Sequence, residues 1–94
     1  MPMKKTFPLH APDKADARVL DAIKHEVRKY VRRELKKPLP DEAVRWTFAC
    51  RVGADQAAAQ PSELKDVAAA IDGVATTGVD SVYVEILAVP EKRP

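Results

Sequence analysis

The sequence predicts an α+β fold, a two-layer sandwich in which a three-stranded sheet carries two helices on one face, in the order strand, helix, strand, helix, strand. Two segments repeat apolar residues at three- and four-residue spacing, the pattern of amphipathic helices. Three others alternate apolar and polar residues, which is typical of strands with one buried face. A chain of 94 residues suffices for one such core, so residues 1–94 are expected to form a single domain.

The first strand is expected over residues 3–9. Phe7 and Leu9 alternate with polar neighbours and are expected to face the core. Pro8 has no backbone N–H to donate, so this strand lies at an edge of the sheet or ends there. A turn at Ala11–Pro12 then precedes the first helix.

One long helix is expected from Asp13, which suits an N-cap, to Lys37, whose helical conformation Pro38 disfavours. At about 100° per residue its apolar positions fall within roughly 160°. They are Val19, Leu20, Ile23, Val27, Tyr30, Val31 and Leu35. The opposite face carries Lys14, Arg18, His25, Arg28, Lys29, Arg32, Arg33 and Lys36. The helix is therefore expected to pack one face on the core and expose a cationic one.

Residues 44–52 give the strictest strand signal. Val44, Trp46, Phe48, Cys50 and Val52 are expected to face inward, and Arg45, Thr47, Ala49 and Arg51 outward. A small-residue loop follows over 53–60, and a second helix is expected from Pro61 or Ser62 with a stop at Gly78. We expect Trp46 to be a core anchor.

The last strand is expected over residues 80–89, with residues 90–94 as a loose, charged tail. Val82, Val84, Ile86 and Ala88 share one face; Ser81, Tyr83, Glu85 and Leu87 share the other. One-sided alternation favours an antiparallel or mixed sheet, although helical connections would also allow parallel pairing. The strand order stays open.

Charge is unevenly distributed along the chain. Residues 1–37 hold eleven Lys and Arg against five Asp and Glu, and residues 38–94 hold five against nine, so balances of +6 and −4 give the net +2. This asymmetry favours a partner such as nucleic acid or an acidic protein. The same pattern arises from a merely solvated face or from copies that associate head to tail.

Binding of nucleic acid or another polyanion is the leading functional hypothesis. The residues that would carry it are Arg18, Arg28, Lys29, Arg32, Arg33 and Lys36 on the helix, and Arg45, Arg51 and Tyr83 on the open sheet face. Repeated cations neutralise phosphates, and an exposed aromatic ring can stack a base. Helix stability alone would not select this pattern, because like charges four residues apart destabilise a helix by roughly 0.2–0.5 kcal/mol each.

The alternative is a protein-interaction or homo-oligomeric module. Tyr83 and Leu87 on the open sheet face, or an unpaired edge strand, would then contact a second copy or a peptide. No apolar stretch approaches the ~20 residues of a membrane span, and the start lacks the apolar run of a secretory signal. We expect a cytoplasmic protein.

No constellation predicts catalysis. Cys50 is the only cysteine, so a disulfide within the chain and a Cys-pair metal motif are excluded, and its inward position favours an inert core thiol. His25 suits a surface role; a metal or acid–base role for His10, near Asp13, is the minor alternative. Glu85 is expected to pair across strands with Arg45 or Arg51. We expect no enzyme activity, no catalytic residue, no metal and no cofactor.

Three segments carry a resemblance to a known family. They are residues 3–9 (MKKTFPL), 18–34 (RVLDAIKHEVRKYVRRE) and 83–87 (YVEIL). Together they resemble a small family of uncharacterised bacterial proteins, and the likeness covers nearly the whole chain from Met3 onward. The family is a domain of unknown function, so the resemblance implies no active site, cofactor or partner.

Overall fold

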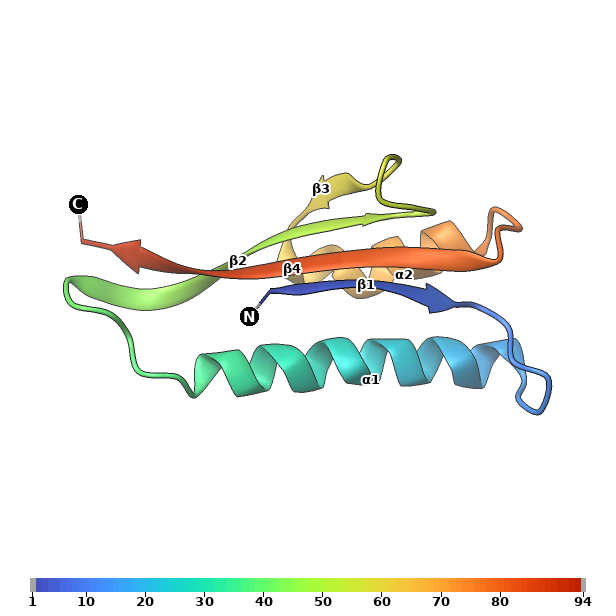
Figure 1. The fold of residues 1–94 in the computed structure, drawn as a ribbon, viewed down its shortest axis with the longest axis horizontal. Coiled ribbons are helices and arrows are strands. Elements are labelled where there is room, and N and C mark those ends of the chain that lie inside the picture. Colours follow the sequence, from blue (N-terminus) through green and yellow to red (C-terminus); the bar gives the residue numbers. More distant parts are fainter. Residues whose placement is uncertain (1, 94) are drawn as a thin grey trace.

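A computed structural model describes residues 2–93 as one sheet with two helices (Figure 1). The elements are β1 (Met3–Pro8), α1 (Asp16–Leu35), β2 (Ala43–Gly53), β3 (Gln60–Ser62), the 3-10 turn η1 (Leu64–Asp66), α2 (Val67–Ala75) and β4 (Ser81–Lys92). The strand order is β1-β4-β2-β3, and every pair is antiparallel. The last strand of the chain is therefore inserted between β1 and β2, which run parallel to each other.

The sheet has four strands, so the predicted three-stranded sheet is wrong. The additional strand, β3, pairs with Cys50–Val52 of β2. Its residues were assigned to the end of a loop and the start of the second helix. Pro61 is compatible with either setting, because proline suits both the first turn of a helix and an edge strand. A three-residue strand is also too short to show alternation.

Several element boundaries differ from the expected ones. α1 spans Asp16–Leu35 rather than 13–37, and its N-cap is Ala15, not Asp13. The second helix begins later, with η1 and then α2. Gly78, the expected stop, lies three residues beyond α2 and has φ +83°, a conformation that favours glycine. β4 runs on to Lys92, so residues 90–92 belong to a strand and not to a loose tail.

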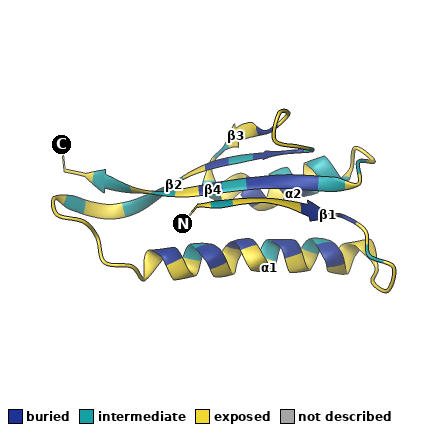
Figure 2. Cartoon of the chain, in the orientation of Figure 1, coloured by how far each residue is buried: buried dark blue, intermediate teal, exposed yellow. Residues whose placement is uncertain are grey.

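One hydrophobic core lies between the sheet and both helices (Figure 2). Its buried members are Phe7, Leu9, Val19, Ile23, Val27, Tyr30, Cys50, Val52, Val67, Ile71, Val82, Val84 and Ile86. Val82, Val84 and Ile86 have no exposed surface, as expected for alternate residues of a central strand covered by helices. The inward orientation predicted for Phe7 and Leu9 is confirmed.

Glu34 is a charged residue within this buried layer. It is 5% exposed and lies in the middle of the apolar face of α1. Lys37 Nζ forms an ion pair with its carboxylate at 2.7 Å and donates a hydrogen bond to it, and the Tyr30 hydroxyl donates to it at 3.5 Å. The hydrogen bond from Lys37 lowers the pKa of Glu34, so the residue is held as an anion.

The far ends of β2 and β4 form a ribbon that extends beyond the helices (Figure 1). β1 pairs with β4 only as far as Ile86, and β3 pairs with β2 only from Cys50. Within the described chain, residues 43–49 and 87–92 therefore pair only with each other; we call this the distal ribbon. Trp46, expected in the core, is half-buried here, and its Nε1 donates to the Lys37 carbonyl at 3.0 Å.

The outer face of the sheet is partly covered by the loop over residues 54–59. A Cβ on Gly53 would stand 2.6 Å from Cα of Ala59, closer than real Cβ contacts. We predict that Gly53→Ala lowers the free energy of unfolding by about 1–3 kcal/mol, because the loop must move away. Urea unfolding followed by circular dichroism measures this change.

Gly73→Ala is the matched control for this substitution. Gly73 lies inside α2 with nothing within 4 Å of its would-be Cβ. Alanine there should raise stability by about 0.5–1 kcal/mol, since glycine loses more backbone entropy in a helix. Equal effects of the two substitutions would show that the loop does not pack on Gly53.

Candidate polyanion-binding surface

Five exposed cations gather on the C-terminal half of α1, on the side away from the core. They are Arg28, Lys29, Arg32, Arg33 and Lys36, and we call them the cationic ridge. At about 100° and 1.5 Å per residue, they fall within roughly 140° of the helix circumference and about 12 Å of its length. The apolar face of the same helix fixes this orientation, because Ile23, Val27 and Tyr30 are buried.

No member of the ridge forms an ion pair within residues 2–93. The lysines on either side of it do: Lys24 contacts Asp72 at 2.7 Å, and Lys37 contacts Glu34 at 2.7 Å. Arg33 additionally lies over the ring of Tyr30, 5.7 Å from its centroid. The ridge is thus a group of positive charges without an ion pair in the described chain, although Arg33 is close enough to Glu34 to help lower the pKa of that carboxyl.

Arg18 does not belong to the ridge. It precedes Arg28 by ten residues, which is about 15 Å along the helix axis. It lines a shallow hollow together with Asp13, Lys14 and Asp21, so its surroundings carry mixed charge. The structure therefore separates Arg18 from the other predicted helix residues.

Arg45 lies in the distal ribbon, where its guanidinium pairs with the carboxylate of Glu91. This hydrogen bond raises the pKa of Arg45. Residue alternation places Arg45 on the opposite side of β2 from the buried Cys50 and Val52, after a bulge between Ala43 and Arg45. It is consequently on the outer face of the sheet, not on the helix face.

Arg51 and Tyr83 also lie on the outer face, in a polar cluster with Glu85. The Tyr83 hydroxyl donates to Glu85 Oε1 at 2.8 Å, and Arg51 Nη1 lies 3.6 Å from the same oxygen. Arg51 Nη2 donates to the Ala59 carbonyl at 3.0 Å. The expected pairing of Glu85 with an arginine on β2 is confirmed. The hydrogen bond between Tyr83 and Glu85 raises the pKa of Tyr83.

Tyr83 was expected to be an exposed ring able to stack a base, and this is wrong. The residue is 5% exposed. Its neighbour across the sheet is Gly53, where the 54–59 loop packs, and Ala59 of that loop is 4% exposed. The nine predicted residues thus divide between two opposite surfaces, and only the ridge forms a continuous cationic group.

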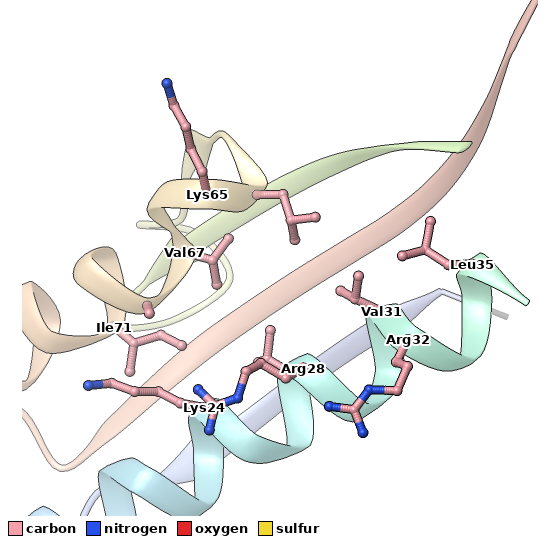
Figure 3. Close-up of a pocket in the computed structure, with 11 residues that line it drawn as sticks. Lys24, Arg28, Val31, Arg32, Leu35, Lys65, Val67 and Ile71 are labelled. Carbon is pink, nitrogen blue, oxygen red and sulfur yellow. The ribbon is translucent and has the colours of Figure 1, made fainter. Parts of the chain in front are cut away.

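The structure has a groove between α1 and α2 that the sequence did not predict (Figure 3). Its volume is about 420 Å³. Val27, Val31 and Leu35 of α1 line one side, and the apolar residues Leu64, Val67 and Ile71 line the other. Lys24, Arg28 and Arg32 edge it on the α1 side, whereas Lys65 extends away from it in Figure 3. The sequence places Val31 and Leu35 at the margin of the apolar face of α1, which was the available signal; in the structure Val31 is half-buried and Leu35 is exposed.

The Cys50 thiol and the His10 imidazole, the other groups considered for catalysis or metal binding, lie in the core and beside a helix terminus, respectively. Cys50 is 5% exposed, and burial raises the pKa of its thiol. His10 Nδ1 lies 2.9 Å from Asp16, whose hydrogen bond raises the histidine pKa. Within residues 2–93, no three His, Cys, Asp or Glu side chains gather to hold a metal ion. No helix in the same range has the length and apolarity to span a bilayer.

Comparison with protein families gives one match. A family model described as a family of unknown function (DUF6172) matches residues 3–94. The chain belongs to this family. No curated protein and no solved structure matches it. Since the DUF6172 family has no assigned function, it transfers no site residue, and the site must be argued from the geometry above.

The ridge geometry predicts a stability gain on removing a positive charge. Arg28 lies four residues before Arg32 and four after Lys24 on α1. Replacing it by Glu converts two like-charge pairs into opposite-charge pairs, each a change of roughly 0.4–1 kcal/mol, so Arg28→Glu should raise the free energy of unfolding by about 1–2 kcal/mol at low salt. Urea unfolding at low and high salt measures this, and the gain should shrink with added salt.

Arg28→Gln is the control, because it removes the repulsion without adding an attraction and should give about half the gain. If Arg28→Glu is less stable than the native chain, Arg28 contributes to folding, and its retention needs no binding partner.

Proposed function

We propose that this domain binds phosphate-rich polyanions, with nucleic acid as the first candidate, through the cationic ridge of α1, and that it does so without catalysis. The observation that carries the proposal is that Arg28, Lys29, Arg32, Arg33 and Lys36 form no ion pair within the described chain, where Arg33 lies near enough to a carboxylate, that of Glu34, to interact with its charge. Five adjacent cations that repel each other along a helix are explained by an external anion more readily than by stability.

The ridge matches the spacing of phosphates. Its length of about 12 Å corresponds to three or four phosphates of one DNA strand, which follow each other every ~3.4 Å along the axis. Arginines bind phosphate through two parallel N–H donors, and the three ridge arginines offer that geometry.

The same composition supports weak sequence preference. In DNA, adenine is read by Asn or Gln and cytosine by Glu or Asp, and single-strand platforms rely on exposed aromatic rings. The ridge holds only Lys and Arg, and Tyr30, the aromatic residue beside it, is 5% exposed. Contacts to phosphates alone position a protein without selecting a sequence.

Salt dependence tests this proposal directly. If about four phosphates are contacted, the affinity for a labelled DNA or RNA duplex or single strand should fall roughly a hundredfold between 50 and 200 mM salt. Fluorescence anisotropy measures it. Lys29→Glu combined with Lys36→Glu should weaken binding at least tenfold and lower the salt slope by about two.

Lys14→Glu with Lys92→Glu is the matched control, since it changes the net charge equally at two exposed lysines outside the ridge. It should leave the salt slope unchanged. Absence of binding at low salt, or equal losses in both double variants, would contradict the proposal.

A second candidate function is self-association through the distal ribbon. In this part of the chain β2 and β4 each leave one edge unpaired, and Leu87 and Val89 are 44% and 38% exposed on the outer face. Unpaired edges and exposed apolar side chains are features of interaction surfaces. The bulge at Ala43/Arg45 and Pro90 restrict the length over which another strand can pair.

If the ribbon pairs two copies, light scattering should show a mass that doubles with protein concentration and persists in high salt, because the contact is mainly apolar. Val89→Lys should abolish the dimer. Leu39→Lys, at an equally exposed leucine outside the ribbon, should not. A constant monomer mass at high concentration excludes this second function.

A further inference from the structure

The groove between α1 and α2 combines an apolar lining with a cationic rim, and it shares Arg28 and Arg32 with the cationic ridge. Its apolar lining comes from both helices, with Val27 and Val31 on the α1 side and Val67 and Ile71 on the α2 side. Figure 3 shows Val31 facing Val67 and Ile71 across the groove. The polar side chains that line it are all cationic: Lys24, Arg28, Arg32 and Lys65. No acid, hydroxyl, amide or aromatic side chain is among its lining residues.

One end of the groove is closed and the other is open. Lys24 of α1 contacts Asp72 of α2 at 2.7 Å, which ties the two helices together at that end. Toward the other end, α1 continues through Leu35, which is 53% exposed. The opposite side of the groove, formed by η1 and α2, ends at Leu64 of η1. Arg28 and Arg32, which form no ion pair within residues 2–93, lie along the rim between these ends.

We infer that this groove binds the alkyl chain of a single-chain anionic amphiphile, a long-chain carboxylate, with the carboxylate held by Arg28 and Arg32. A volume of 420 Å³ falls in the range of small-molecule sites, about 300–1,000 Å³. An apolar floor recovers the hydrophobic free energy of the chain, and a guanidinium pairs with a carboxylate through two charge-assisted hydrogen bonds.

The groove follows α1 from Lys24 to Leu35, a length of about 16 Å, and its volume of about 420 Å³ lies toward the lower end of the range for small-molecule sites. A nucleic acid is disfavoured in the groove, because no aromatic ring is present among its described lining residues to stack a base.

Chain length and head-group charge test the inference on the native protein. Calorimetric titration with octanoate, decanoate and dodecanoate below their micelle concentrations should show one site per chain of protein. Affinity should rise about fourfold for each added methylene, the gain expected from burying CH₂ groups. Dodecanol, which lacks the charge, should bind at least tenfold more weakly than dodecanoate.

Two neighbouring alanines of α2 supply a matched pair of variants. Ala68 lines the groove and Ala69 does not, and both are exposed. Ala68→Trp should fill the groove and weaken dodecanoate binding at least tenfold, whereas Ala69→Trp should leave it unchanged. Arg28→Gln with Arg32→Gln should weaken dodecanoate binding about tenfold and leave dodecanol binding unaltered.

The inference fails if dodecanoate does not saturate one site, if affinity is independent of chain length, or if the two tryptophan variants bind equally. These results are independent of the nucleic-acid proposal, because Lys29 and Lys36 do not line the groove and Ala68 is not part of the ridge. Oligonucleotide binding that survives Ala68→Trp, together with dodecanoate binding that survives Lys29→Glu with Lys36→Glu, would establish two separate activities.

Discussion

The central position of β4 is the constraint on which the rest of the structure depends. β4 pairs with β1 on one side and β2 on the other, and Val82, Val84 and Ile86 on its inner face have no exposed surface. Both helices pack on this strip of aliphatic side chains through residues such as Val27 and Ile71. Because the final strand joins elements from the whole chain, the core is complete only when this strand is in place.

That central strand also determines which surfaces are free. With the apolar face of α1 committed to the core, its cationic face must point to solvent, and the ridge is a direct consequence of packing. The outer face of the sheet differs, because Arg51 and Glu85 there form an ion pair and Arg51 also donates a hydrogen bond to the Ala59 carbonyl of the 54–59 loop. The charged residues of the two outer surfaces therefore differ. Those on the outer face of the sheet pair with each other, whereas those of the cationic ridge form no ion pair within the described chain.

Local pattern was sufficient to predict that α1, β2 and β4 exist and which side of their central parts faces inward, since strong periodicity extends over many residues in these elements. It was wrong toward their ends, where Leu35 of α1 and Val44 of β2, both expected to face the core, are 53% and 44% exposed. It failed where the outcome depends on distant contacts. β3 is three residues long, and only its pairing with β2 defines it. The burial of Tyr83 results from a loop some thirty residues earlier in the chain packing near Gly53. The burial of Glu34 could not be predicted from the pattern. A charge in an apolar face needs polar contacts, and those from Lys37 and Tyr30 are visible only in the structure.

The candidate site likewise has one part that local sequence pattern predicts and one part that depends on contacts between distant segments. The cations of the ridge follow from helix periodicity alone, because residues 28–36 lie on one regular helix. The groove depends on the shortness of α2, nine residues against twenty in α1, which leaves the C-terminal half of α1 without a full-length neighbour. Arg28 and Arg32 belong to both features. If each binds its own anion, the two ligands compete for these guanidiniums, and occupancy of the groove would then weaken polyanion binding at the ridge through loss of two of its five charges.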